Sequence, residues 1–275
     1  MKKFRLIALL LALLLLQGTV GCKREENNLL CVTVLDVGQS ECVLLTLGDK
    51  AMLIDAGSCV WQDELVGELA LRGVKKLDAL FITHPHEDHY GNARLLLETH
   101  TVEALILPTM ESEEPGYRIL EDTAARLAVS VRQMMDGDRF TFGDALCEVF
   151  CALPEDTEGN NASNVLRVSF GDCVLLFMGD AEEQAENALL ARDIIWRCDL
   201  LKVGHHGSKT ASSSRFLQAC APKIAAISCG KDNDYGFPHS EVLEGLAAVG
   251  AAVYRTDLSG SLAFACDGKS VYYME

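Results

Sequence analysis

The sequence is poor in basic residues for its size. Its 275 residues contain 24 Lys and Arg against 40 Asp and Glu, which gives a formal net charge of -16. A protein that binds nucleic acid in bulk needs a basic face. The chain contains no run of Arg or Lys and little interleaving of basic with aromatic residues. This balance argues against a bulk nucleic-acid binder.

A CxxC pair is also absent, although the chain contains eleven cysteines. Structural zinc sites are usually closed cages rich in cysteine, so none is expected. Ten cysteines follow residue 22, most of them in apolar, strand-like runs such as those around Cys31, Cys173 and Cys229. We expect mostly buried thiols, while an even number in an exported protein leaves disulfides open.

The longest apolar run, residues 6–16, is shorter than the roughly 20 residues that span a bilayer. It follows Lys2, Lys3 and Arg5 and precedes a small-residue stretch that ends at Cys22. This layout is typical of a secretory signal peptide. The Thr-Val-Gly before Cys22 resembles a bacterial lipobox, which implies a lipidated cysteine. An ordinary cleaved signal or an uncleaved anchor remains the alternative.

We therefore divide the chain into a lipoprotein-type signal (1–22), a polar tether (23–28) and one domain (29–275). The mature chain would carry 21 basic and 40 acidic residues, a net charge of -19. We expect it outside the cytoplasmic membrane, anchored by its lipid or secreted. No stable protein partner is predicted.

Hydrophobic residues make up 49% of the chain and charged residues 23%, which excludes disordered, collagen-like and low-complexity classes. Apolar strand-like runs alternate with helical segments in two halves, with no linker between them. That rhythm predicts a layered α/β domain. We expect strands at 29–37, 41–48, 50–57, 77–84, 102–108, 138–143, 145–153, 165–171, 172–180, 199–206 and 223–230. Helices are expected at 67–73, 92–100, 181–193, 212–222 and 240–250, with another beginning at residue 118 and a strand and hairpin in the tail.

Histidine is scarce, yet six of the seven histidines lie in three short clusters near strand ends. The first cluster is His84-Pro-His86-Glu-Asp88-His89, between a strand and a helix. His84 and His86 can face one ion, and Asp88 and His89 a second. Imidazole and carboxylate suit Zn²⁺, Mn²⁺ or Fe. A solvated polar loop is the alternative, which five titratable groups within six residues argue against.

Three further candidate metal ligands or ligand pairs come after expected strands: Asp180, His205-His206 and His239. Asp180 can bridge two ions with its two carboxylate oxygens, although an Asp at a helix start also caps. Either His205-His206 or His239 could supply the last ligand of the second ion.

These segments resemble the metallo-β-lactamase-fold hydrolases, and more closely the extracellular metallo-hydrolase domain of ComEC-type DNA-uptake proteins and their stand-alone relatives. The segments that carry the resemblance are 32–45 (with Asp36), 52–57 (with Asp55), 81–92, 160–182, 201–213 and 233–246. It implies a four-layer αβ/βα sandwich. It does not imply DNA transport, because the chain has no channel helices.

The chain departs from the family pattern at several positions. Ser40-Glu41 stands where Gly-Asp is usual, which alters a pocket wall. Asn160-Asn161 stands where general members carry a third histidine, which predicts a less tightly held first ion.

The resemblance and the clusters together predict hydrolysis by a hydroxide bridging two divalent ions, Zn or Mn. His84 and His86 would hold one ion, Asp88 and His205 or His206 the other, and Asp180 would bridge them. Asp55 would orient a ligand histidine. Lys202, His206 and His239 are candidates for contacting an anionic substrate or protonating the leaving group.

The predicted substrate is a phosphodiester, with DNA as one candidate. The acidic balance instead favours an envelope phosphodiester or another ester. A non-catalytic surface-binding lipoprotein with the same fold is the alternative from another class.

Overall fold

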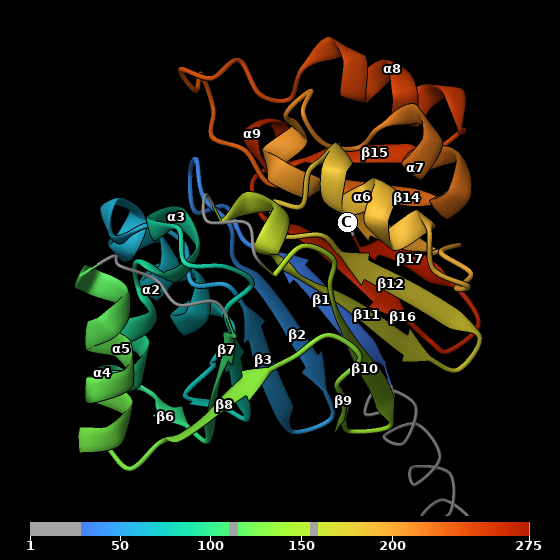
Figure 1. Ribbon diagram of the computed structural model, residues 1–275. Coiled ribbons are helices and arrows are strands. Elements are labelled where there is room, and N and C mark those ends of the chain that lie inside the picture. Colours follow the sequence, from blue (N-terminus) through green and yellow to red (C-terminus); the bar gives the residue numbers. More distant parts are fainter. Residues whose placement is uncertain (1–28, 110–114, 155–158, 275) are drawn as a thin grey trace, which may run out of the picture.

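The computed structural model describes residues 29–109, 115–154 and 159–274. The signal segment, Cys22 and the tether lie outside these residues. The described chain forms two large β-sheets, packed face to face, with helices on both outer faces (Figure 1). The predicted four-layer αβ/βα sandwich is confirmed.

The first sheet has eight strands in the order β17-β16-β1-β2-β3-β5-β7-β8. Neighbouring strands are antiparallel from β17 to β3 and parallel from β3 to β8. Their bounds are β1 Leu30–Val34, β2 Val43–Leu47, β3 Lys50–Ile54, β5 Ala79–Phe81, β7 Ala104–Pro108, β8 Ser130–Met134, β16 Leu262–Cys266 and β17 Val271–Met274.

The second sheet has seven strands in the order β15-β14-β13-β12-β11-β10-β9. Strands β12 to β15 are parallel, and β9 to β12 are antiparallel. The bounds are β9 Arg139–Phe142, β10 Ala145–Cys151, β11 Asn164–Phe170, β12 Cys173–Phe177, β13 Leu200–Lys202, β14 Ile224–Ile227 and β15 Ala252–Arg255. A two-stranded sheet pairs β4 (Lys76–Leu77) with β6 (Thr101–Val102).

Helices cover each sheet on its outer face. On the first sheet lie α2 (Gln62–Leu71), α4 (Ala93–Thr99) and α5 (Pro115–Arg126), and on the second α6 (Glu183–Leu190), α7 (Ser214–Cys220) and α8 (Ser240–Ala248) (Figure 1). The short helices α3 (Glu87–Tyr90) and α9 (Thr256–Ser259) lie in loops.

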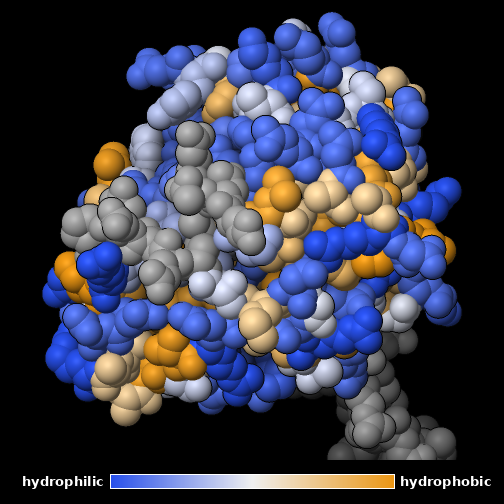
Figure 2. Space-filling model, viewed as in Figure 1, coloured by the Kyte–Doolittle hydropathy of each residue, from blue (hydrophilic) through white to orange (hydrophobic). Residues whose placement is uncertain are grey.

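Three apolar layers hold the sandwich together. The central one joins both sheets, with Phe81, Phe177 and Phe264 fully buried. The other two pack each sheet against its own helices. Strands in such a position are buried on both faces, so they read as continuous apolar runs rather than alternating ones. The visible surface is mostly hydrophilic, with apolar side chains in small separate groups (Figure 2).

The expectation of mostly buried thiols is confirmed: all ten cysteines of the described chain are free, and eight are buried. Among the described helices, none combines the length and the apolar character needed to cross a membrane.

Candidate metal centre

Two sheets contribute to one cluster of histidines and carboxylates. The HPHEDH segment follows β5 of the first sheet and runs into α3. Asp180 follows β12 and His205-His206 follow β13, both in the second sheet. The carboxyl ends of parallel strands meet at one edge of a sheet, which is where α/β proteins place ligand sites. The sandwich thus assembles the three sequence clusters at a shared edge.

One group of side chains lies on one side of Asp180, and we call His84, His86 and His205 the first group. His84 Nε2 is 3.1 Å from His86 Nδ1 and 3.8 Å from Asp180 Oδ2. His205 Nε2 is 3.7 Å from the same Asp180 oxygen. These atoms could therefore face one ion.

The second group consists of Asp88, His89 and His206. The other oxygen of Asp180, Oδ1, is 3.2 Å from His89 Nε2 and 3.8 Å from His206 Nε2. Asp88 Oδ2 is 3.3 Å from His206 Nε2 and 3.8 Å from His89 Nε2. Asp180 thus stands between the two groups, with one oxygen toward each. The choice that the sequence left open has an answer in this geometry: His206 lies with Asp88, and His205 lies with His84.

Hydrogen bonds behind the cluster fix the orientation of its rings. Asp55 Oδ2 is 2.7 Å from His89 Nδ1, and both oxygens of Asp55 accept bonds from Thr83. His206 Nδ1 lies 3.0 Å from the Ser228 carbonyl oxygen. Such partners leave Nε2 free for a metal and set the ring's direction. The placement of Asp55 is the one predicted from the sequence.

Backbone strain also concentrates here. Asp55, His205 and His206 have positive φ angles of 62°, 47° and 53°. Non-glycine residues rarely adopt this region, and where they do the strain often marks a functional site. The surrounding sheets hold these three side chains in directions that an unstrained backbone would not give.

The electrostatics of the cluster favour a bound cation. Burial lowers the pKa of His84 well below its ordinary value, which keeps the ring neutral and able to bind a metal. Burial also opposes charge on His89, but the nearby carboxylates of Asp180, Asp55 and Asp88 outweigh it and raise its pKa well above the ordinary value. Without another cation, a proton on His89 balances these carboxylates.

Buried atoms without partners test whether metal ions fit. Within the described chain, His89 Nε2, His206 Nε2 and Asp180 Oδ1 are buried and have no hydrogen-bond partner. Buried polar atoms normally are bonded, and three orphans that converge are what a divalent cation would satisfy. The donor types, imidazole and carboxylate, are those of Zn²⁺ and Mn²⁺. The residues therefore fit a metal centre.

A cavity of about 710 Å³ opens onto the cluster. Its walls include Trp61, Tyr235 and Phe237, and the Tyr235 and Phe237 rings stack with their centroids 5.3 Å apart. Asn160 also lines it, as predicted, and its Nδ2 lies 3.5 Å from Glu182 Oε1. No Lys or Arg of the described chain lines this cavity.

Four residues predicted to contact substrate or to orient ligands do not line this cavity. Lys202 is fully buried, and its ammonium group donates to Glu41 Oε2 at 2.6 Å and to the Val203 carbonyl, so it does not face a substrate. His239 lies outside the cavity wall, where its Nδ1 accepts from the Lys209 N–H. These placements correct the expectation that either side chain contacts an anionic substrate.

The observed hydrogen bonds of Asn161 and Asp36 are to other parts of the fold. Asn161 Oδ1 accepts from the backbone N–H groups of Glu182 and Ala185 and so caps the start of α6. Asp36 lies outside the cavity lining, and its backbone N–H donates to Ser261 Oγ.

Sequence reasoning missed Glu41 and the aromatic wall. Glu41 is fully buried, and one of its carboxylate oxygens has no hydrogen-bond partner among the described residues. The departure from the family's Gly-Asp pattern was the available signal. The aromatic residues gave none, since exposed rings in loops carry no periodicity.

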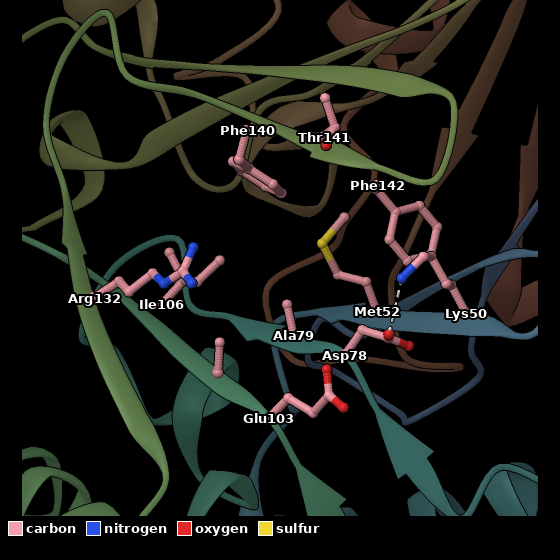
Figure 3. Close-up of a pocket in the computed structure, with 11 residues that line it drawn as sticks. Lys50, Met52, Asp78, Ala79, Glu103, Ile106, Arg132, Phe140, Thr141 and Phe142 are labelled. Carbon is pink, nitrogen blue, oxygen red and sulfur yellow. Dashed lines mark hydrogen bonds and ion pairs between the residues drawn. The ribbon is translucent and has the colours of Figure 1, made fainter.

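A second cavity, of about 560 Å³, lies at the other end of the sandwich. Figure 3 shows the side chains that line it. It is lined by Lys50, Asp78 and Glu103, which stand at the amino ends of β3, β5 and β7, and by residues of β8 and β9. Within the lining Lys50 pairs with Asp78 at 3.3 Å, while Glu103 pairs at 2.7 Å with Lys76, which lies outside the lining. Without a histidine or cysteine in its lining, it offers no comparable chemistry.

The family model of the metallo-beta-lactamase superfamily matches residues 35–231, the segment that holds every residue of the two groups. The chain belongs to that superfamily. It is therefore a member of a hydrolase family, and it carries clustered residues that could bind divalent metal ions.

Curated relatives place the chain in the ComEC-like group of competence metallo-hydrolases. It is 31% identical to ComE operon protein 3 of Bacillus subtilis over 88% of this chain and 33% of that protein. It is 32% identical to competence protein ComA of Neisseria gonorrhoeae (92% and 35%) and to recombination protein 2 of Haemophilus influenzae (84% and 28%). The chain therefore spans about a third of the length of these relatives.

Solved structures share the fold. The metallo-beta-lactamase fold protein YhfI of Bacillus subtilis aligns with a TM-score of 0.59 at 14% identity, over 86% of this chain and 100% of that one. A diphosphatase of the PhnP family aligns with a TM-score of 0.53 at 15% identity, over 86% and 98%. At such identities the likeness shows the fold alone.

Proposed function

We propose that this superfamily member is a dinuclear metal-dependent phosphodiesterase that works outside the cytoplasmic membrane, held there by a lipid on Cys22. One observation carries the catalytic part of the proposal: Asp180 points one oxygen at the first group and the other at the second. A carboxylate so placed can bridge two ions.

In this proposal the first group and Asp180 would hold one ion, and the second group and Asp180 would hold the other. Two ions held there would activate a water at neutral pH and offset negative charge on the phosphate. The chain's own residues provide the geometry: Asp55 and the Ser228 carbonyl fix the rings of His89 and His206.

The cavity walls favour a small phosphodiester over a long strand. A polynucleotide needs several cationic contacts along its backbone, and the described lining of this cavity contains neither Lys nor Arg. The stacked Tyr235 and Phe237 rings offer a flat apolar surface for one group of a diester. DNA ends are the second candidate, because the relatives are named as competence and recombination proteins.

A substrate panel tests the proposal. We expect the lipid-free protein, loaded with Zn²⁺ or Mn²⁺, to hydrolyse bis(p-nitrophenyl) phosphate and to turn over single- or double-stranded DNA more slowly. Asp180→Ala should lose this turnover by about 10²-fold or more, since it removes the residue shared by both groups.

The alternatives give different results on the same panel. Rapid DNA cleavage that weakens steeply with salt indicates a nuclease. Turnover of carboxylic esters but of no diester indicates another esterase, and no turnover of any substrate by metal-loaded protein supports a surface-binding lipoprotein.

A further inference from the structure

We infer that Glu41 is a further metal ligand, which completes the second group, and that Lys202 is the positioning residue that aims it. The inference rests on the proposed dinuclear centre. Glu41 lies outside the three sequence segments that supply the other proposed ligands.

Glu41 is fixed in place by its backbone. It lies in the loop before β2, its N–H donates to the Asp88 carbonyl at 3.1 Å, and its own carbonyl accepts from Gly57 at 2.8 Å. The loop of the first sheet is thereby clamped against the start of α3, which carries part of the second group. The side chain is fully buried beside that group.

The two carboxylate oxygens of Glu41 have different surroundings. Oε2 accepts from Lys202 Nζ at 2.6 Å, and both side chains are fully buried. Oε1 is buried without any hydrogen-bond partner in the described chain. Burying a carboxylate oxygen without a hydrogen-bond partner is unfavourable, so this oxygen needs a partner.

The available partner is the metal centre. One carboxylate oxygen of Glu41 lies within 4.8 Å of ligand atoms of His89, Asp180 and His206, and each of these residues also holds a buried atom without a partner. Each of the four residues thus brings a buried atom that lacks a hydrogen-bond partner, and all four lie around one point. A divalent cation there satisfies all four at once.

Lys202 occupies Oε2, which leaves Oε1 as the oxygen available to a metal ion. Its ammonium group holds Oε2 and donates its next hydrogen to the Val203 carbonyl. The buried pair also leaves the carboxylate's charge balanced before a metal arrives, which a lone buried Glu would not.

Glu41 changes the character of the second group. With it, three carboxylates and two imidazoles would be available to the second ion, more donors than a four-coordinate zinc site has. Such an oxygen-rich set suits Mn²⁺.

The test is metal binding by the full chain rather than activity. Metal-free wild-type protein and Glu41→Gln are titrated with Mn²⁺, followed by calorimetry and by electron paramagnetic resonance. We expect wild type to bind two ions with a spin-coupled spectrum. Glu41→Gln should keep one ion and bind the second about tenfold or more weakly, with an uncoupled six-line spectrum.

Two further variants keep the result interpretable. Glu186→Gln is the matched control: Glu186 is also a buried glutamate, but its oxygens accept from Ser212 and Ser213 N–H groups away from the cluster. It should bind Mn²⁺ as wild type does. If Glu41→Gln fails to fold, the double variant Glu41→Leu/Lys202→Met removes the pair as a unit, a change that buried ion pairs often tolerate.

The outcomes separate this inference from the proposed function. Wild-type binding of fewer than two ions overturns the dinuclear centre, and the role of Glu41 with it. If wild type binds two ions and both Glu41 variants bind the second ion with unchanged affinity, only the inference about Glu41 is overturned. The same follows if Glu186→Gln loses as much affinity for the second ion as Glu41→Gln does.

Discussion

At the scale of the residue, the candidate site depends on carboxylates that act through other side chains. Asp55 is fully buried and has a positive φ angle, and its two carboxylate oxygens bond to Thr83 and His89. It sets the direction of a ring whose other nitrogen faces Asp180. Removing its charge should therefore weaken metal binding without removing any ligand.

Asp55→Asn should raise the dissociation constant of the second ion by about 10- to 100-fold. The amide keeps the size of the side chain but weakens its bond to His89. Calorimetric titration with Mn²⁺ measures the change. Asp78→Asn is the control, because Asp78 also accepts a backbone N–H, from Ala51, but at the other end of the same sheet. Equal affinities for Asp55→Asn and wild type contradict the orienting role.

At the scale of the element, strand ends and helix starts decide which residues meet. The second sheet delivers Asp180 and the His205-His206 pair, and α6 begins just after Asp180 with its cap supplied by Asn161. The same helix start holds Glu182, whose Oε1 lies 3.0 Å from His205 Nδ1. Capping and ring orientation are thus coupled at one end of α6.

Asn161→Ala should destabilise the fold by about 1–2 kcal/mol, the usual effect of losing a helix cap. Two backbone N–H groups, of Glu182 and Ala185, lose their acceptor. Urea unfolding monitored by circular dichroism measures this change. An unchanged unfolding midpoint and slope would show that Asn161 does not cap α6. Asn161 would then again be a candidate for contacting substrate.

Much of the element order was predictable from apolar runs. The expected strand 77–84 is β5, Ala79–Phe81, and it is shorter because the polar residues after it form the HPHEDH loop. Strand β8, Ser130–Met134, was missed because this edge strand is exposed at four of its five residues and lacks an apolar run.

The site was predictable where its residues are close in sequence. His84, His86, Asp88 and His89 come within six positions, so their chemistry is visible without a structure. Lys202 and Glu41 are 161 residues apart, and only the packing of the two sheets makes them a buried pair. A charged residue beside His205-His206 therefore looked like a substrate contact.

At the scale of the whole molecule, the chain combines a metallo-hydrolase fold with a strongly acidic balance. It spans about a third of the length of its competence relatives. With a formal net charge of -16, repulsion from a polyanion is strong unless local groups offset it. The metal-facing cavity, lined by aromatic and acidic side chains and by no Lys or Arg of the described chain, adds no positive charge to offset it.

The proposed anchor makes a prediction about location. Cys22→Ala should abolish incorporation of labelled palmitate and shift the protein from the membrane pellet to a soluble fraction, because a lipid on Cys22 would no longer form. Cys59→Ala, which changes an exposed cysteine of the described chain, should leave both unchanged. Membrane attachment that persists without Cys22 indicates an uncleaved signal anchor instead.

The central claim is that two ions, bridged by Asp180, make this protein a phosphodiesterase. It is tested most directly by titrating metal-free protein with Mn²⁺ while following bis(p-nitrophenyl) phosphate turnover. The account predicts little activity with one equivalent and a rise that ends at two equivalents per chain. Full activity at one equivalent, or equal turnover without metal, would contradict it.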